Sequence, residues 1–327
     1  MALTFKKAER KQVRIKVGLA GPAGSGKTMS SLLMAYGIVK AEFPNLSDAE
    51  VWSKIVVIDT ENGSGSLYVG KQVGPTTIGE YNTIDLTPPF DPQIFIDAIH
   101  MAENHGMDVI IIDSLSHAWA GSGGALDIQG KAAERTSSWA AWRTVTPLHN
   151  KLVDAMLQSN AHIIANMRAK MEYQQTEENG KKAVKAVGMG VVMRDGIEYE
   201  FTVSFMLDYN HVASSTKDRT GMFDGKYFVI DANTGKQMYQ WLSSGVPAEA
   251  PAPNVPAPAP APAPESEERI QKAIAAIDAL VQPMVKDADA DTKKAIGEKI
   301  KGIIGIANYK KCTDIDKLIA LYNAFKE

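Results

Sequence analysis

Cysteine, long apolar runs and an excess of one charge sign are all scarce in this chain of 327 residues. The single cysteine, Cys312, excludes an internal disulfide framework and any zinc site built from cysteines. The six histidines show no metal-ligand spacing. The net charge of −3 argues against a protein that coats nucleic acid with its whole surface, but it leaves room for a local basic groove.

Segments that direct a chain into or across a membrane are missing as well. No apolar run reaches roughly 18 residues, so the sequence predicts no membrane span and no membrane partner. Residues 1–7 lack the apolar stretch of a secretion signal. Together with the low cysteine content, this predicts a cytoplasmic protein.

Composition nonetheless supports a folded protein with two parts. Apolar residues make up 45% of the chain, which allows a substantial core. Residues 246–265 are almost entirely alanine and proline, and this pattern favours extended polyproline II over a helix. We predict a semi-rigid spacer there, with a ligand for a proline-recognition domain as the alternative. The predicted division is a core at 1–245, the linker at 246–265 and a small helical module at 266–327.

The helical module carries no catalytic constellation, so we interpret it as a docking or DNA-handling module. One helix is predicted near its start, a second over 292–307, and a third after a capping box formed by Thr313 and Asp316. The predicted inward residues are Ile270, Ile274, Ile277, Leu280 and Val281 in the first helix, and Ile315, Leu318, Ile319, Tyr322 and Phe325 in the last.

Strands and helices alternate before the linker. Short apolar runs flanked by turn residues are typical of buried parallel strands, and the alternation predicts an α/β fold with a mainly parallel sheet. Beyond Tyr199 the pattern becomes β-rich, which predicts an antiparallel end of that sheet. The expected strands are 55–59, 109–113, 162–166, 200–209, 212–216 and 227–230, and the expected helices include 92–104 and 139–158.

The clearest motif is Gly-Pro-Ala-Gly-Ser-Gly-Lys-Thr at 21–28, between a strand-forming run at 13–20 and a helix-forming run at 29–40. Its glycines let successive N–H groups converge on a phosphate, and the helix N-terminus adds partial positive charge. We predict that ATP and Mg²⁺ bind here, with Lys27 on the β- and γ-phosphates and Thr28 on the metal. A plain glycine-rich turn is the alternative. The predicted nucleotide-binding residues of the loop are Gly21, Pro22, Ala23, Gly24, Ser25, Gly26, Lys27, Thr28 and Met29.

Two acidic strand ends are expected to complete this site. The apolar run ending at Asp113 should place that carboxylate at the sheet edge beside Thr28, where it orients Mg²⁺ or its waters. The strand at 54–58 is followed by Asp59 and Glu61, which strand alternation points to the same side. Glu61, further out, is the predicted base for a water that attacks the γ-phosphate. An ordinary acidic loop is the alternative.

This order of motifs resembles the RecA-like recombinase core. The resemblance implies that Glu61 is catalytic, that Asp113 and Ser114 lie on the metal side, and that Asn166 senses the γ-phosphate, although RecA itself has glutamine there. Residues 217–221, Lys-Asp-Arg-Thr-Gly, resemble the Lys-Asn-Arg-Phe-Gly segment of RadA-type recombinases. That likeness implies a homo-oligomer, filament or ring, in which Lys217 and Arg219 reach a neighbour's phosphates.

A narrower resemblance is to the ATP-binding proteins of tailed phages and prophages, which include RecA-like annealing proteins of the Sak type. It rests on residues 5–10, on the phosphate-binding loop, on Arg-Asp-Gly-Ile-Glu-Tyr-Glu-Phe at 194–201 and on residues 218–223. It covers residues 5 to about 243 and excludes the linker and tail. It implies a phage or prophage origin and action in a bacterial host cell.

Two basic segments are candidates for single-stranded DNA. By position, 116–138 and 168–194 resemble the two DNA-binding loops of the family, and basic residues on mobile backbone with an aromatic nearby, such as Trp139, suit sequence-tolerant binding. A solvated hairpin around Asn179-Gly180 is the alternative for the second segment. The candidate residues are Lys131, Arg135, Arg168, Lys170, Lys181, Lys182 and Lys185.

The leading hypothesis is therefore an ATPase that binds single-stranded DNA and promotes annealing or recombination. A host or phage single-strand-binding protein is the predicted partner of the C-terminal module. The alternatives are a motor, loader or packaging-associated ATPase acting on duplex DNA or protein, a small-molecule phosphotransferase, and a nucleotide-gated adaptor. The chain has no arginine-rich lid, which argues against the phosphotransferase.

Overall fold

The computed structural model describes residues 5, 7, 12–178, 181–245, 267–286, 288–306, 308–312 and 314–326, without the side chains of 172–187 and 267–269. The chain divides into two compact units, Met1–Ala248 and Glu249–Glu327. The predicted linker, 246–265, lies outside the described residues. Within the described ranges, no helix has both the length and the apolar character that a membrane crossing requires.

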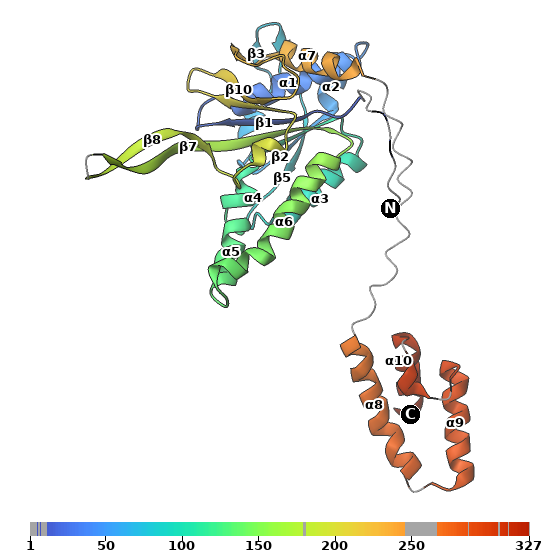
Figure 1. Ribbon diagram of the computed structural model, residues 1–327. Helices are drawn as coiled ribbons and strands as arrows, with labels where there is room; N and C mark the ends of the chain where they lie inside the picture. The colour runs from blue at the N-terminus through green and yellow to red at the C-terminus, as the bar shows by residue number, and fades with distance from the viewer. Residues whose placement is uncertain are drawn as a thin grey trace. The chain divides into compact units, whose positions relative to one another are not determined.

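A nine-stranded sheet forms the centre of the larger unit (Figure 1). Its order is β11-β10-β9-β1-β7-β6-β2-β5, with β8 paired to β7. The strands from β9 to β5 run parallel, whereas β10 and β11 are antiparallel, as expected for this end. The strands are β1 (Lys16–Gly21), β2 (Ile55–Asp59), β5 (Asn82–Asp85), β6 (Val109–Asp113), β7 (His162–Glu178), β8 (Lys181–Val191), β9 (Val203–Leu207), β10 (Val212–Asp218) and β11 (Tyr227–Val229), beside a small hairpin of β3 (Gln72–Val73) and β4 (Thr76–Thr77).

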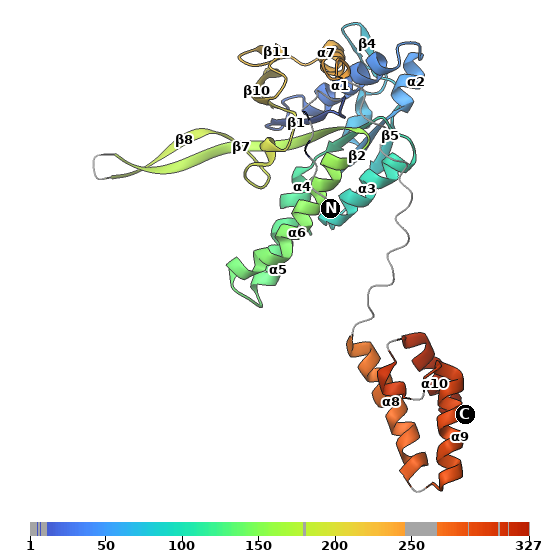
Figure 2. The same ribbon diagram turned by 45° about the vertical axis from the view of Figure 1, so that its right-hand side comes forward.

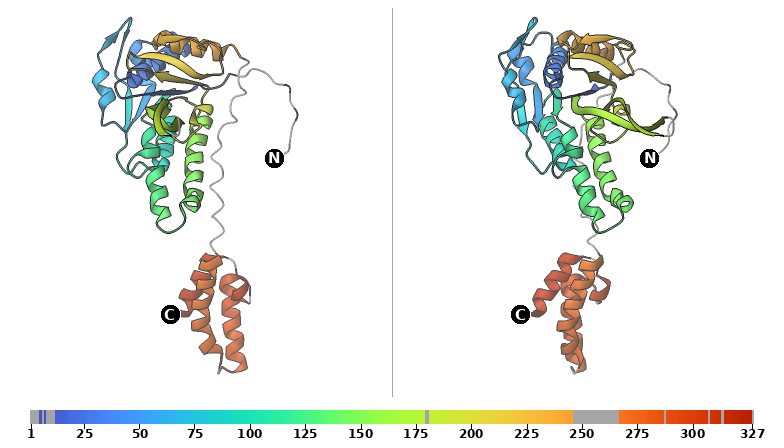
Figure 3. Two further views of the ribbon diagram at one scale, coloured as in Figure 1. Left: turned by 60° about the vertical axis from the view of Figure 1, so that its left-hand side comes forward. Right: turned by 90° about the vertical axis from the view of Figure 1, so that its left-hand side faces the viewer.

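Helices cover both faces of the sheet, which confirms the predicted α/β fold (Figures 1 and 3). Strand β2 is continuously apolar because helices cover both of its faces. Val57 packs with the helices on one face, and Val56 and Ile58 pack with those on the other. One face carries α1 (Lys27–Glu42), α2 (Asp48–Ser53) and α7 (Ala232–Ser243); the other carries α3 (Pro92–Asn104), α4 (Ser116–Ala120) and α6 (Ser138–Gln158). Helix α5 (Ala125–Ala133) packs against α6 and α4.

Helices α1 and α7 cross at two glycines. A Cβ atom on Gly37 would lie 1.8 Å from the carbonyl oxygen of Ala232, and one on Gly235 would lie 2.0 Å from that of Met34. Neither position accepts a side chain unless the helices separate. The two backbones are therefore in direct contact.

Strands β7 and β8 extend past the sheet as a two-stranded arm (Figures 1 and 2). Their pairing runs from Ala169 with Val191 to Glu178 with Lys181. This is the hairpin named above as the alternative for 168–194; its turn residues, Asn179 and Gly180, lie outside the described residues.

The segment 116–138 is not the mobile loop that its glycines and serines predicted. It forms α4 and α5 and leads into α6. The four residues 121–124, which include three glycines, form only the bend between α4 and α5, where the Asp127 carboxylate accepts a hydrogen bond from Gly123 N (2.8 Å). Ala, Leu, Gln and Lys, which favour helix, dominate the nine residues of α5.

The smaller unit contains α8 (Glu267–Lys286), α9 (Ala290–Ile304), the 3₁₀ turn η3 (Tyr309–Lys311) and α10 (Ile315–Lys326). Its core includes Ile277, Leu318 and Phe325, as predicted, but Leu321 is fully buried, whereas Ile319 is 47% exposed. The cap of α10 also differs: the carboxylate of Asp314 accepts from the N–H of Asp316 and of Lys317, and Thr313 lies outside the described residues.

Candidate active site

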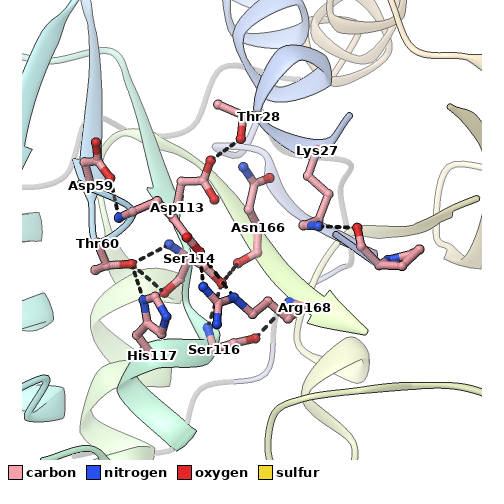
Figure 4. A network of polar contacts seen from close by, with 12 residues as sticks. Lys27, Thr28, Asp59, Thr60, Asp113, Ser114, Ser116, His117, Asn166 and Arg168 are labelled. Atoms are coloured by element: carbon pink, nitrogen blue, oxygen red, sulfur yellow. Dashed lines mark hydrogen bonds and ion pairs between the residues drawn. The ribbon is translucent and has the colours of Figure 1, made fainter. Parts of the chain in front are cut away.

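The polar ends of three parallel strands lie in one row. In the strand register Asp59 of β2 is opposite Asp113 of β6, and Asp113 is opposite Asn166 of β7. Parallel strands bring their carboxyl ends to one edge of the sheet, so residues far apart in sequence meet there. Figure 4 shows this edge with the start of α1 beside it.

The predicted phosphate loop joins β1 to α1 at the same edge. Gly24 and Gly26 have φ values of 79° and 86°, the left-handed region that glycine tolerates. Helix α1 begins at Lys27, so its first N–H groups face the loop. The Lys27 ammonium donates to the carbonyl oxygens of Gly21 and Pro22 at 2.9 Å each, and burial lowers its pKa. This geometry suits a bound anion.

Thr28 and Asp113 meet, as the sequence predicted. The Thr28 hydroxyl donates to the Asp113 carboxylate at 2.5 Å. Burial raises the pKa of Asp113, while the hydrogen bond from Thr28 opposes that rise. Mg²⁺ prefers oxygen ligands and usually takes one or two protein groups with substrate phosphates and waters. The pair fits that requirement: Thr28 and Asp113 would hold the ion, which would neutralise phosphate charge.

Asn166 is fully buried between the loop helix and Asp113. Its Oδ1 accepts from the Ser31 hydroxyl of α1 at 2.6 Å. Burial raises the pKa of Asp113, and the nearby Nδ2 of Asn166 opposes that rise. Within the described part of the chain, neither this Nδ2 nor the Ser25 hydroxyl makes a hydrogen bond of normal geometry. Buried donors left unpaired cost roughly 1–3 kcal/mol each, so both suit a site completed by a ligand.

Glu61, the predicted base, is held by an arginine. Arg168 donates to one carboxylate oxygen of Glu61, from Nη2 at 2.7 Å and from Nε at 3.2 Å. The two side chains are 49% and 30% exposed, so the pair is open to solvent. Arg168 was predicted to contact DNA, and its position at the root of the β7–β8 arm connects that arm to Glu61.

Asp59 does not share the orientation that alternation predicted for it and Glu61. Strand β2 ends at Asp59. The buried Asp59 carboxylate accepts hydrogen bonds from the N–H groups of two residues that follow it, Glu61 (2.5 Å) and Gly63 (2.8 Å). Asp59 therefore shapes the turn that carries Glu61.

Thr60 and His117 belong to this network, although no sequence signal marked them. The Thr60 hydroxyl accepts from the N–H of Ser114 at 2.8 Å and lies 2.6 Å from Nδ1 of His117 (Figure 4). Burial lowers the pKa of His117, and nearby Arg168 lowers it further. The Ser114 hydroxyl donates to the Asn166 carbonyl at 3.2 Å, which makes Ser114 a bracing residue.

Lys217 and Arg219 lie away from the phosphate loop of their own chain. Lys217 pairs with Ser204 near the start of β9, whereas the loop follows the far end of β1, to which β9 is parallel. The Lys217 ammonium donates to the carbonyl oxygens of Tyr199 and Phe201, and Arg219 donates to Tyr199 at 3.2 Å.

The remaining basic candidates lie on two projecting elements. Lys170 is exposed at the root of the arm, and Lys181, Lys182 and Lys185 are positions of β8 whose side chains are not described. Lys131 and Arg135 are exposed on and after α5.

A family model described as an AAA domain matches residues 14–236. The chain belongs to this AAA-domain family. No curated protein matches the chain. AAA-type domains are P-loop ATPases that generally use ATP and Mg²⁺, so this AAA-domain protein is a P-loop NTPase whose family activity is nucleotide hydrolysis.

Proposed function

We propose that this AAA-domain protein is a DNA-dependent ATPase that binds single-stranded DNA and promotes annealing or recombination, in a phage or prophage context. The observation that carries the proposal is the contact of Arg168 with Glu61. It joins Glu61, the residue proposed to activate water, to the arm proposed to bind DNA.

The chemistry assigned to the site is hydrolysis of the β–γ phosphate linkage of ATP. Lys27 and the first N–H groups of α1 bind the phosphates, and Asn166 donates its free Nδ2 to the γ-phosphate. A water attacks the γ-phosphorus, the Glu61 carboxylate takes its proton, and ADP leaves with the electrons of the broken bond.

Arg168 restrains this chemistry until DNA is present. The two hydrogen bonds from Arg168 hold the Glu61 carboxylate in the ion pair, so it cannot turn toward the attacking water while the pair is intact. DNA phosphates on the arm compete for the half-exposed guanidinium and release Glu61. Hydrolysis then depends on DNA.

The arm and the α5–α6 pair offer the two features that a sequence-tolerant strand site needs. The arm carries the basic residues Lys170, Lys181, Lys182 and Lys185. Trp139, at the start of α6, is 80% exposed and has the exposed Arg143 one helical turn further on. Exposed aromatic and basic side chains together suit base stacking and phosphate binding.

The proposal includes a homo-oligomer with ATP at subunit interfaces. Lys217 and Arg219 lie at the sheet edge opposite their own phosphate loop, which supports a role on a neighbour's nucleotide. The helical tail, joined through residues 246–265, would recruit a single-strand-binding protein of host or phage.

Fluorescence anisotropy on a labelled single strand, with and without ATP, tests the proposal together with ATP turnover on the same strand. We expect binding at low salt and faster turnover with the strand, and Lys27→Ala should abolish turnover. Absence of binding in both nucleotide states would refute the DNA role.

Membership of the AAA-domain family favours a second candidate, a motor, loader or packaging-associated ATPase acting on duplex DNA or protein. The same turnover assay separates the two. Stimulation by duplex DNA or by a protein, with no effect of single strands, would favour this second function.

A further inference from the structure

The turn between β9 and β10, residues 208–211, lies directly against the phosphate loop. A Cβ atom on Gly21 would be 2.8 Å from the carbonyl oxygen of Leu207, and one on Gly26 would be 2.9 Å from Nδ1 of His211. The end of β9 thus lies against the first glycine of the loop, and the turn lies against its last glycine. No sequence pattern indicates this contact, because it depends on the pairing of β9 with β1.

Hydrogen bonds hold the turn in one shape. The Asp208 carboxylate accepts from the N–H groups of Asn210 (2.8 Å) and Val212 (2.9 Å), and the Asp208 carbonyl accepts from that of His211 (3.2 Å). His211 has a φ of 64°, the left-handed region that a residue with a side chain rarely adopts. This backbone places the His211 ring over Gly26.

The direction of the bound triphosphate follows from the order of the strands. Asp113 and Asn166 lie in β6 and β7, and Glu61 follows β2; these three strands all lie on one side of β1. The γ-phosphate must face these groups, since they act on it. The nucleoside, at the other end of the triphosphate, must then point toward β9 and the turn.

We propose that Tyr209 and His211 form the platform on which the nucleobase of the substrate stacks. Tyr209 is 72% exposed and His211 is exposed, so both rings are open to a planar ligand. Stacking of a base on an aromatic side chain changes affinity by about tenfold or more. The inference rests on the proposed ATPase function, whose nucleoside-binding residues it supplies.

Isothermal titration calorimetry of the full chain with ATP and with inorganic tripolyphosphate, each with Mg²⁺, tests this. Tripolyphosphate has the phosphates without the nucleoside. We expect ATP to bind more tightly, and Tyr209→Ala and His211→Ala each to raise the Kd of ATP about tenfold without changing that of tripolyphosphate. Tyr209→Phe should retain wild-type affinity. Tyr227→Ala is the matched control, because Tyr227 is 79% exposed on β11.

The outcomes separate the platform from the ATPase. If ATP and tripolyphosphate bind the wild-type chain equally, or Tyr209→Ala leaves the Kd of ATP unchanged, the platform is refuted while the proposed function stands. If both ligands weaken equally in the variants, the turn only supports the loop and the platform is again refuted. If the wild-type chain binds neither ligand, both proposals fail.

Discussion

At the scale of single residues, Arg168 and Lys16 show how burial and pairing control a charged side chain. Arg168 is half exposed and paired with Glu61, the predicted base, so a competing anion can reach the guanidinium and break the pair. Lys16 is 6% exposed, and within the described residues its ammonium donates to two carbonyl oxygens, those of Ser159 at 2.9 Å and Ala161 at 2.7 Å. The first side chain is suited to regulation, and the second affects stability.

Arg168→Ala should free Glu61. We expect ATP hydrolysis without DNA to rise several-fold and stimulation by single-stranded DNA to disappear, as measured by phosphate release. Lys226→Ala, an exposed lysine on the opposite part of the sheet, is the control. A fall in hydrolysis without DNA would contradict the restraint and indicate that Arg168 assists the reaction.

Lys16→Met should change how stability depends on pH. Burial lowers the pKa of Lys16 to about 7, from 10.5 in the unfolded chain. Between these values the unfolded chain binds the extra proton, so the free energy of unfolding rises with pH. Relative to Lys16→Met, the wild type should gain on the order of 1 kcal/mol per pH unit from about pH 7 to about pH 10 in urea denaturation. Parallel curves would refute the shift, and exposed Lys236→Met is the control.

At the scale of elements, the arm and the α5–α6 pair are the parts that leave the compact body of the larger unit (Figures 1 and 2). Strand β7 serves both regions: its first half lies in the central sheet and carries Asn166, and its second half forms the arm. Any movement of the arm would therefore involve the strand that also carries Asn166.

Replacing Lys181, Lys182 and Lys185 by alanine should weaken binding of single-stranded DNA and make it less dependent on salt. Each lost phosphate contact reduces the slope of log affinity against log salt by about 0.7, so three should reduce it by about 2. Anisotropy at a series of salt concentrations measures the slope. Alanine at Lys71, Lys226 and Lys236 is the matched control, and equal slopes for the two triple variants would remove the arm from the DNA site.

The strands that build the site could be predicted from sequence alone. The ranges 55–59 and 109–113 match β2 and β6 because an apolar run bounded by polar residues marks both ends of a buried parallel strand. The pairing of Glu61 with Arg168 joins residues 107 positions apart and depends on the turn that Asp59 holds. Helices α4 and α5 could not be predicted because the glycines between them are typical of a loop. Neither contacts between distant residues nor short helices separated by glycines can be predicted from local sequence patterns.

At the scale of the whole molecule, the predicted base lies near the phosphate loop, and the basic pair lies at the opposite end of the strands. Glu61 and Asp113 lie near Lys27 of the phosphate loop, whereas Lys217 and Arg219 donate to carbonyl oxygens of Tyr199 and Phe201. In the proposed oligomer, this basic pair would complete the charge around a phosphate bound by the neighbouring copy.

Mixing two inactive variants tests this arrangement. Lys27→Ala keeps the basic pair and loses the phosphate loop, and Arg219→Ala does the reverse. Equal mixtures should regain about a quarter of wild-type hydrolysis, since that share of random interfaces joins an intact loop to an intact Arg219. Circular dichroism confirms that both variants fold. No recovery on mixing would place Arg219 in a structural role.

The glycine crossing of α1 and α7 has a mechanical consequence. Helix α1 starts at the phosphate loop, and α7 ends at Ser243, shortly before the predicted linker at 246–265. With Gly37 against Ala232 and Gly235 against Met34, no side chain separates the two backbones at these two positions. If this crossing is kept while α1 moves during the nucleotide cycle, α7 and its last residue, Ser243, move with α1.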